Sequence, residues 1–216
     1  MKGLILRDLL IYFRRLNKSS YVTEGIMFLF FLGVSIGSPD IGLSAYVLLC
    51  LPIQMCAMPM SMKDMDSNYS GTILARLMPF TGKELVRSRF LSAFCIQGFY
   101  GIVGVIFCLL HGMIFGSMGF GQYVLMLIGG LLMGTVLTSM NLMAGFLGNI
   151  NVTSVVYVAV IVAAAVVYII MAALKINVAQ VIARPSVLWI CGVVFTGAVL
   201  LAAYKVSEYV FCAKRG

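Results

Sequence analysis

The sequence predicts an all-α polytopic membrane protein with six transmembrane helices, an N-terminal interfacial helix and a short cytosolic helix. Three observations support this fold class. Of the 216 residues, 62% are hydrophobic and only 10% are charged, whereas about 25% of the residues in soluble domains are charged. Six apolar stretches each have close to the ~20 residues that a helix needs to cross the hydrocarbon. The charged residues collect between and outside these stretches.

Each apolar stretch is expected to form one membrane-spanning helix. The first carries Glu24 near its start and has only 17 residues, so it is the weakest of the set. Two connections are very short, at residues 37–40 and 148–151. The expected spans are Val22–Ser38, Ile41–Met60, Phe90–Phe115, Tyr123–Leu147, Val152–Leu174 and Val187–Val206.

These spans belong to one transmembrane domain over residues 1–216. Its expected parts are an interfacial helix (1–18), spans one and two (22–60), a cytosolic loop (61–89), spans three to six (90–206) and a cytosolic tail (207–216). No expected segment outside the bilayer exceeds about 30 residues, which leaves no room for a catalytic or nucleotide-binding domain. We therefore expect no enzyme activity here, and an energy source in another chain or an ion gradient.

The distribution of lysine and arginine predicts the orientation. With six spans, thirteen of the fifteen cations fall on one side of the membrane: five in the N-terminal segment, five in the 61–89 loop, and Lys205, Lys214 and Arg215 at the C-terminal end. The remaining two lie in the fifth connection, residues 175–186. Because cytosolic loops carry the excess of basic residues, both termini and the long loop are expected in the cytosol.

The N-terminal segment Lys2–Lys18 reads as an amphipathic helix. Arg7, Arg14 and Lys18 recur on one face, and apolar residues recur at helical spacing on another. A segment of this length with five cations cannot span, so it is expected to lie in the interface with its cations near anionic headgroups. The alternative is a basic leader that only orients the chain. The apolar positions are Leu6, Leu9, Leu10, Phe13 and Leu16.

The polar stretch Ser61–Arg89 is expected to form a structured cytosolic surface. Ser70 can cap a short helix, which ends at Met78–Pro79 because proline restricts the residue before it. Thr81 and Glu84 then form a capping-box pattern, which predicts a second helix leading into the third span. The apolar positions of the short helix are Ile73, Leu74 and Leu77.

Polar chemistry inside the expected spans is sparse. No acidic residue lies near the middle of a span, and the single histidine, His111, has no carboxylate near it in the sequence. We therefore expect no metal site and no catalytic residues. Thr138 and Asn141 lie three residues apart in the fourth span. They could face a translocation path or simply bond a neighbouring helix.

Glycines are frequent in the third and fourth spans. Gly98, Gly101 and Gly104 recur every three residues, and Gly130 and Gly134 form a small-xxx-small pair. Close helix packing explains such patterns. Such glycine patterns would also suit helices that slide past one another during a transport cycle.

Three segments of the chain resemble the ABC-2 family of exporter permeases, in particular its small six-span bacterial members. The opening LILRDLLIYFRR is similar to the beginning of the family's interfacial "elbow" helix, and MKDMDSNYSG matches an acidic stretch after the second span. The phrase ARLMPFTGKELVRSRFLSAF resembles a family phrase with leucine and proline followed by lysine, glutamate and valine, although Gly82 stands where arginine is common. The match covers roughly residues 1–16 and 63–94.

The resemblance implies the permease subunit of an ATP-driven exporter. A second permease copy or paralogue would complete the dimer, and ATP and Mg would be bound by a separately encoded ABC ATPase rather than by this chain. The segment from Asn68 to Leu77 would be the coupling helix, with Tyr69, Ile73, Leu74 and Leu77 contacting the ATPase.

The scarcity of charge in the spans indicates an amphipathic or apolar cargo, such as a peptide, an antibiotic or a lipid-like molecule. Membrane lipids are expected partners and nucleic acid is not. A gradient-driven secondary transporter and a membrane anchor or assembly subunit are the alternatives. The secondary transporter is disfavoured because the spans lack a central carboxylate and a visible repeat.

Overall fold

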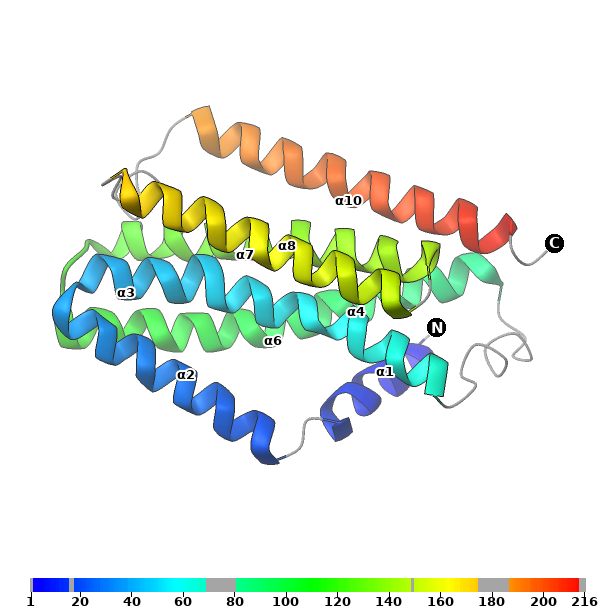
Figure 1. Ribbon diagram of the computed structural model, residues 1–216, viewed down its shortest axis with the longest axis horizontal. Coiled ribbons are helices and arrows are strands. Elements are labelled where there is room, and N and C mark those ends of the chain that lie inside the picture. Colours follow the sequence, from blue (N-terminus) through cyan, green and yellow to red (C-terminus); the bar gives the residue numbers. More distant parts are fainter. Residues whose placement is uncertain (1, 16–17, 69–80, 149, 175–186, 214–216) are drawn as a thin grey trace.

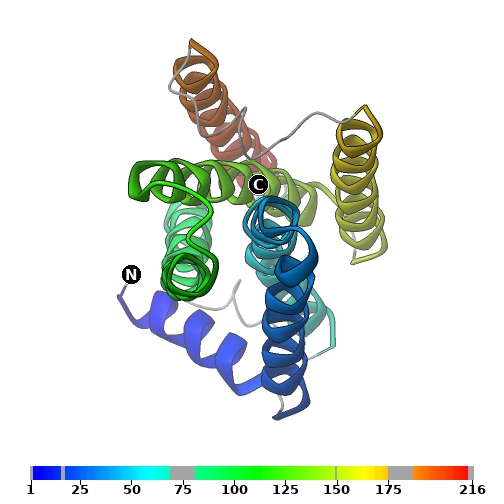
Figure 2. The same ribbon diagram turned by 90° about the vertical axis from the view of Figure 1, so that its left-hand side faces the viewer.

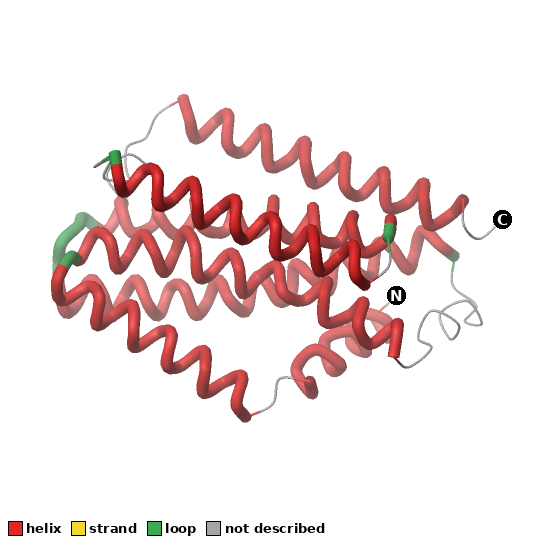
Figure 3. Tube along the Cα trace, in the orientation of Figure 1, coloured by secondary structure: helices red, strands yellow, loops and turns green. Residues whose placement is uncertain are grey.

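The computed structural model describes residues 2–15, 18–68, 81–148, 150–174 and 187–213. Every regular element among these residues is helical, as Figure 3 shows, so the all-α prediction is confirmed. The elements in chain order are α1 (Lys2–Arg15), α2 (Lys18–Gly37), α3 (Pro39–Ala45), η1 (Tyr46–Cys50), α4 (Leu51–Asn68), α6 (Gly82–Phe115), α7 (Phe120–Leu147), α8 (Ile150–Ala173) and α10 (Val187–Ala213).

Five helical stretches of the described chain are long and apolar enough to cross a membrane. They are Pro39–Ala57, Gly82–Phe115, Phe120–Leu147, Asn151–Met171 and Trp189–Ala213, and they correspond to the expected second to sixth spans. The expected first span corresponds to Tyr21–Gly37, which is a shorter apolar helix. A membrane crossing by α2 therefore stays a prediction.

The long helices run back and forth along the long axis of the molecule (Figure 1). The N-terminal helix α1, the start of α6 and the end of α10 gather at one end. Tight turns join the helices at the other end: the Ser38 N–H bonds the Val34 carbonyl at 3.2 Å, and Gly116 ends α6 with a left-handed φ of 53°. An L side chain rarely adopts that φ, so glycine suits the position.

Helix α7 lies at the centre of the bundle and contacts α4, α6, α8 and α10 (Figure 2). Two of its glycines let it approach η1 and α4 closely. A Cβ at Gly130 would lie 2.3 Å from the Val47 carbonyl oxygen, and one at Gly134 would lie 2.5 Å from the Met55 sulfur. The close-packing interpretation of this glycine pair is therefore confirmed. Of the three regularly spaced glycines in α6, Gly98 is the open one: a Cβ added there would meet no atom within 4 Å.

The second span contains a π-helical turn, η1, between α3 and α4. Pro52 lies two residues after the end of this turn. Because proline has no N–H to give to the carbonyl four residues earlier, the regular α ladder is interrupted here. The turn belongs to the protein core: Tyr46 stacks on Phe107 of α6 with ring centroids 3.9 Å apart, and Val47 faces Gly130 of α7.

The helices on either side of the polar stretch extend further than the sequence indicated. The expected loop began at Ser61 and ended at Arg89, whereas α4 continues to Asn68 and α6 begins at Gly82. Methionine, lysine and aspartate can continue a helix beyond the hydrocarbon, and the segment after Thr81 was already expected to be helical. Residues 69–80 lie outside the part of the chain that the structure describes.

Candidate functional site

Helix α1, the start of α6 and the end of α10 meet at one end of the molecule (Figure 1), and these elements carry several charged residues. The described cations of these elements include Arg14, Lys83, Arg87 and Lys205. Lys83 Nζ lies 3.2 Å from Glu208 Oε1 and so links α6 to α10. Such an exposed pair contributes little stability, but the arrangement gathers at one end the regions that the orientation argument places in the cytosol.

A buried ion pair attaches α1 to this end of the bundle. The side chain of Asp8 is fully buried, and its Oδ2 lies 3.5 Å from Nε of Arg89 on α6. Arg7 Nη2 contacts the other carboxylate oxygen at 3.0 Å. Arg89 also contacts the sulfur of Met62 on α4. Because a buried carboxylate needs charge-paired neighbours, these contacts fix the position of α1 against both helices.

A chain of hydrogen bonds makes a second attachment of α1. Tyr100 of α6 donates to Glu24 Oε1 of α2 at 2.6 Å, and the hydroxyl oxygens of Tyr12 and Tyr100 are 3.1 Å apart. Since Tyr100 gives its proton to Glu24, Tyr12 is the donor to Tyr100. Burial raises the pKa of the Tyr12 phenol above its ordinary value, which keeps that proton in place.

The three cations predicted for the interfacial helix, Arg7, Arg14 and Lys18, have different surroundings. Arg7 pairs with Asp8, whereas Arg14 is exposed. Lys18 is the first residue of α2, and its side chain lies outside the described set. Leu6 and Leu10 are 59% and 60% exposed, so α1 keeps an apolar face turned away from the bundle. Such a face suits a membrane interface, and the contact of these cations with headgroups stays a prediction.

The expected ATPase-contacting residues Tyr69, Ile73, Leu74 and Leu77 lie outside the described residues. Their assignment to a coupling helix stays a prediction. The capping box that follows them is present: Glu84 N–H donates to Thr81 Oγ1 at 3.3 Å, and Thr81 N–H donates to Glu84 Oε2 at 2.9 Å. It starts the unbroken helix α6 directly after this segment.

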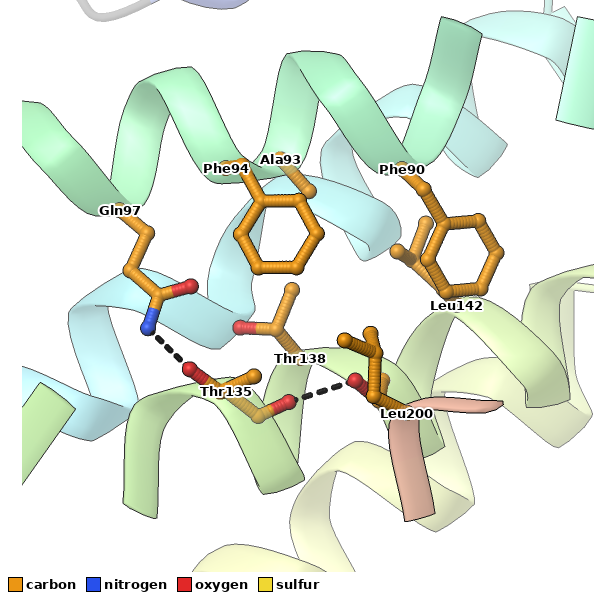
Figure 4. A pocket seen from close by; sticks show the side chains of 9 residues that line it. Phe90, Ala93, Phe94, Gln97, Thr135, Thr138, Leu142 and Leu200 are labelled. Atoms are coloured by element: carbon orange, nitrogen blue, oxygen red, sulfur yellow. Dashed lines mark hydrogen bonds between the residues drawn. The ribbon is translucent and has the colours of Figure 1, made fainter. Parts of the chain in front are cut away.

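The two residues proposed for a translocation path are both buried on α7. Asn141 Nδ2 donates to the Cys56 carbonyl of α4 at 2.8 Å, so this amide bonds a neighbouring helix. Thr138 instead faces a small pocket between α6, α7 and α10, together with Gln97, Thr135 and Ser139 (Figure 4). Gln97 Nε2 donates to the Leu131 carbonyl at 2.8 Å and to Thr135. We refer to Gln97, Thr135, Thr138 and Ser139 as the amide–hydroxyl cluster.

No role was assigned to Asp8 or Gln97 from the sequence. Helical spacing held a signal for Asp8, because Leu4, Asp8 and Tyr12 lie on one face and all three are buried. No local signal identifies Gln97, since its partners come from another helix.

The side chain of His111 is hydrogen-bonded to two other groups of the protein. It is fully buried, with Nδ1 2.9 Å from the Tyr123 hydroxyl and Nε2 3.1 Å from the Pro39 carbonyl. The described residues include no cluster of histidine, cysteine or acidic side chains that could hold a metal ion.

The fold and its charge distribution define a multi-pass α-helical membrane protein with one highly charged end. A protein-family model described as "ABC-2 family transporter protein" matches residues 3–211. The chain therefore belongs to the ABC-2 family of transporter proteins, and the resemblance found in its sequence is confirmed. No curated protein matches the chain. No solved structure matches it either.

Proposed function

We propose that this chain is the permease subunit of an ATP-driven ABC exporter in a bacterial plasma membrane, with both termini in the cytosol. The observation that carries the proposal is the family match across residues 3–211. In this proposal a separately encoded ABC ATPase binds ATP and Mg, and two permease subunits, identical or paralogous, form the membrane part.

The geometry of the charged end supports an ATPase docking surface there. The segment 69–80 joins α4 to α6, and Arg89 of α6 contacts Met62 of α4 and pairs with Asp8 of α1. A force applied to this segment would therefore act on helices that are already connected by buried contacts. Tyr69, Ile73 and Leu77 share one face of the expected coupling helix. We propose that they anchor the ATPase, with Leu74 beside them.

The cargo is proposed to be amphipathic or apolar, such as a peptide, an antibiotic or a lipid-like molecule. The polar groups buried between α6 and α7 at the amide–hydroxyl cluster are amides and hydroxyls, which carry no charge. Groups of this kind can bond an uncharged polar part of a cargo, whereas a small ion calls for charged or carbonyl ligands.

Co-purification from the source membrane tests the assignment. The affinity-tagged chain should retain an ATPase with a Walker A motif, identified by mass spectrometry, and the complex should hydrolyse ATP in nanodiscs. The variant Tyr69→Ala with Ile73→Ala should insert normally but lose the ATPase, because aromatic and aliphatic anchors typically contribute about 2 kcal/mol or more each to a small interface.

A matched control comes from the opposite end of the molecule. Met113 and Phe120 are 83% and 78% exposed, and they too combine an aliphatic with an aromatic side chain. The variant Met113→Ala with Phe120→Ala should keep the ATPase. Retention of the ATPase by both variants would refute the coupling assignment. Uptake driven by an ion gradient without ATP would instead support a secondary transporter, and normal insertion with no ATPase and no transport would favour an anchor or assembly subunit.

A further inference from the structure

The small pocket at the amide–hydroxyl cluster lies inside the membrane-spanning part of the bundle. Residues of α6 and α7 form its walls, and Leu200 of α10 covers it (Figure 4). The space open to a water-sized sphere is about 10 Å³. This is close to the smallest volume that holds one water molecule, provided that the water also finds polar partners.

Thr138 supplies one such partner. Its side chain is only 4% exposed, and its hydroxyl oxygen is buried without a hydrogen-bond partner in the protein. Buried hydroxyls are rarely left without a hydrogen bond, because no new bond then offsets the free-energy cost of removing the hydroxyl from water. Threonine in a helix usually avoids this cost by bonding a carbonyl one turn earlier. Thr135 and Thr196 do so, with distances of 2.8 Å to the Leu131 and Gly192 carbonyls.

Gln97 supplies the second partner across the pocket. Its amide nitrogen has two hydrogens, and these bond the Leu131 carbonyl and Thr135. Its side-chain carbonyl oxygen therefore remains available as an acceptor. Figure 4 shows that this oxygen and the Thr138 hydroxyl both turn toward the space between α6 and α7.

We propose that this pocket binds one ordered water molecule that bridges Thr138 and Gln97. The Thr138 hydroxyl donates to the water oxygen, and the water donates to the Gln97 carbonyl oxygen. The bridge satisfies the buried hydroxyl and adds a polar link between α6 and α7 beneath Leu200. This inference concerns the resting bundle and does not depend on the exporter assignment.

Thermal unfolding of two variants separates a hydrated pocket from a dry one. Thr138→Val keeps the shape of the side chain and removes the hydroxyl. If the hydroxyl is unbonded, its removal relieves a desolvation cost and the melting temperature rises. If it holds a water, removal leaves the water short of a partner and the melting temperature falls by several degrees. Thr196→Val is the control, because that hydroxyl bonds its own helix, and it should change the melting temperature less.

Water-edited solid-state NMR of the full chain in lipid nanodiscs gives a direct readout. With ¹³C-labelled threonine, the Thr138 methyl signal is identified by its loss in Thr138→Val. We expect magnetisation from water to reach Thr138 faster than Thr196. Equal or slower transfer to Thr138 would overturn the proposal, and so would a higher melting temperature for Thr138→Val.

Discussion

Replacing Gly130 by alanine tests whether the contact of α7 with the π-helical turn holds the bundle together. The added Cβ would lie 2.3 Å from the Val47 carbonyl oxygen and 3.1 Å from Val47 Cγ1. Ordinary contacts of a Cβ begin near 3.4 Å, so the overlap with the oxygen is about 1 Å. A backbone atom cannot turn aside as a side chain can, and α7 must therefore move away from η1.

The expected cost follows from two opposing effects. Overpacking of a tight site typically costs about 1–3 kcal/mol. Alanine regains up to about 1 kcal/mol over glycine in a helix. We expect Gly130→Ala to lower the free energy of unfolding by roughly 1–2 kcal/mol and to lower the melting temperature. Gly134→Ala should cost less, because the atom it meets is the sulfur of Met55, which belongs to a flexible side chain.

The assay is thermal unfolding of the detergent-solubilised chain, followed by circular dichroism. Gly98→Ala is the matched control, since Gly98 also lies in a helix and the added Cβ would meet no atom within 4 Å. Its melting temperature should stay the same or rise. If Gly130→Ala melts at the same temperature as Gly98→Ala, the close approach of α7 to Val47 is wrong, and the argument from small residues fails with it.

Two further predictions concern the charged end. Asp8→Asn should destabilise the chain by roughly 3 kcal/mol, because it removes the buried carboxylate that pairs with both Arg7 and Arg89. Arg89→Gln should cost less, because Asp8 keeps its contact with Arg7, and the double variant should cost less than the sum; additive costs in a double-mutant cycle would contradict the pairing. In a cysteine-free background, Ser67→Cys should react with a membrane-impermeant thiol reagent only after permeabilisation, whereas Ser117→Cys should react in intact cells. Labelling of position 67 from outside would reverse the proposed topology.

Features encoded by neighbouring residues were predictable from the sequence. The Thr81–Glu84 capping box, the turn before Pro39 and the end of α7 at Leu147 all follow from contacts within a few residues. The second to sixth spans were predictable for a similar reason, since hydrophobic length is a local property. The glycine pair at Gly130 and Gly134 indicated close packing, although not which helix would approach.

Features that depend on partners far along the chain were not predictable. The Asp8–Arg89 pair joins residues of different helices, and so does the hydrogen bond from Asn141 to Cys56. A single sequence does not show which residues from distant parts of the chain lie close in space. From its basic neighbours alone, Asp8 would be interpreted as an exposed acidic residue. The π-helical turn had a local signal in Pro52, but proline alone does not distinguish a kink from a π turn.

Helix α6 physically connects the two regions to which the proposals assign a role. It begins with the capped turn after residue 81 and continues without a break to Phe115. Arg89, which binds Asp8, and Gln97, in the amide–hydroxyl cluster, are eight residues apart, which is about 12 Å along the helix axis. A continuous helix is stiff over that length, so a shift of its first turns carries Gln97 with it. Because Gln97 bonds α7 through Leu131 and Thr135, such a shift must either move α7 as well or break those bonds.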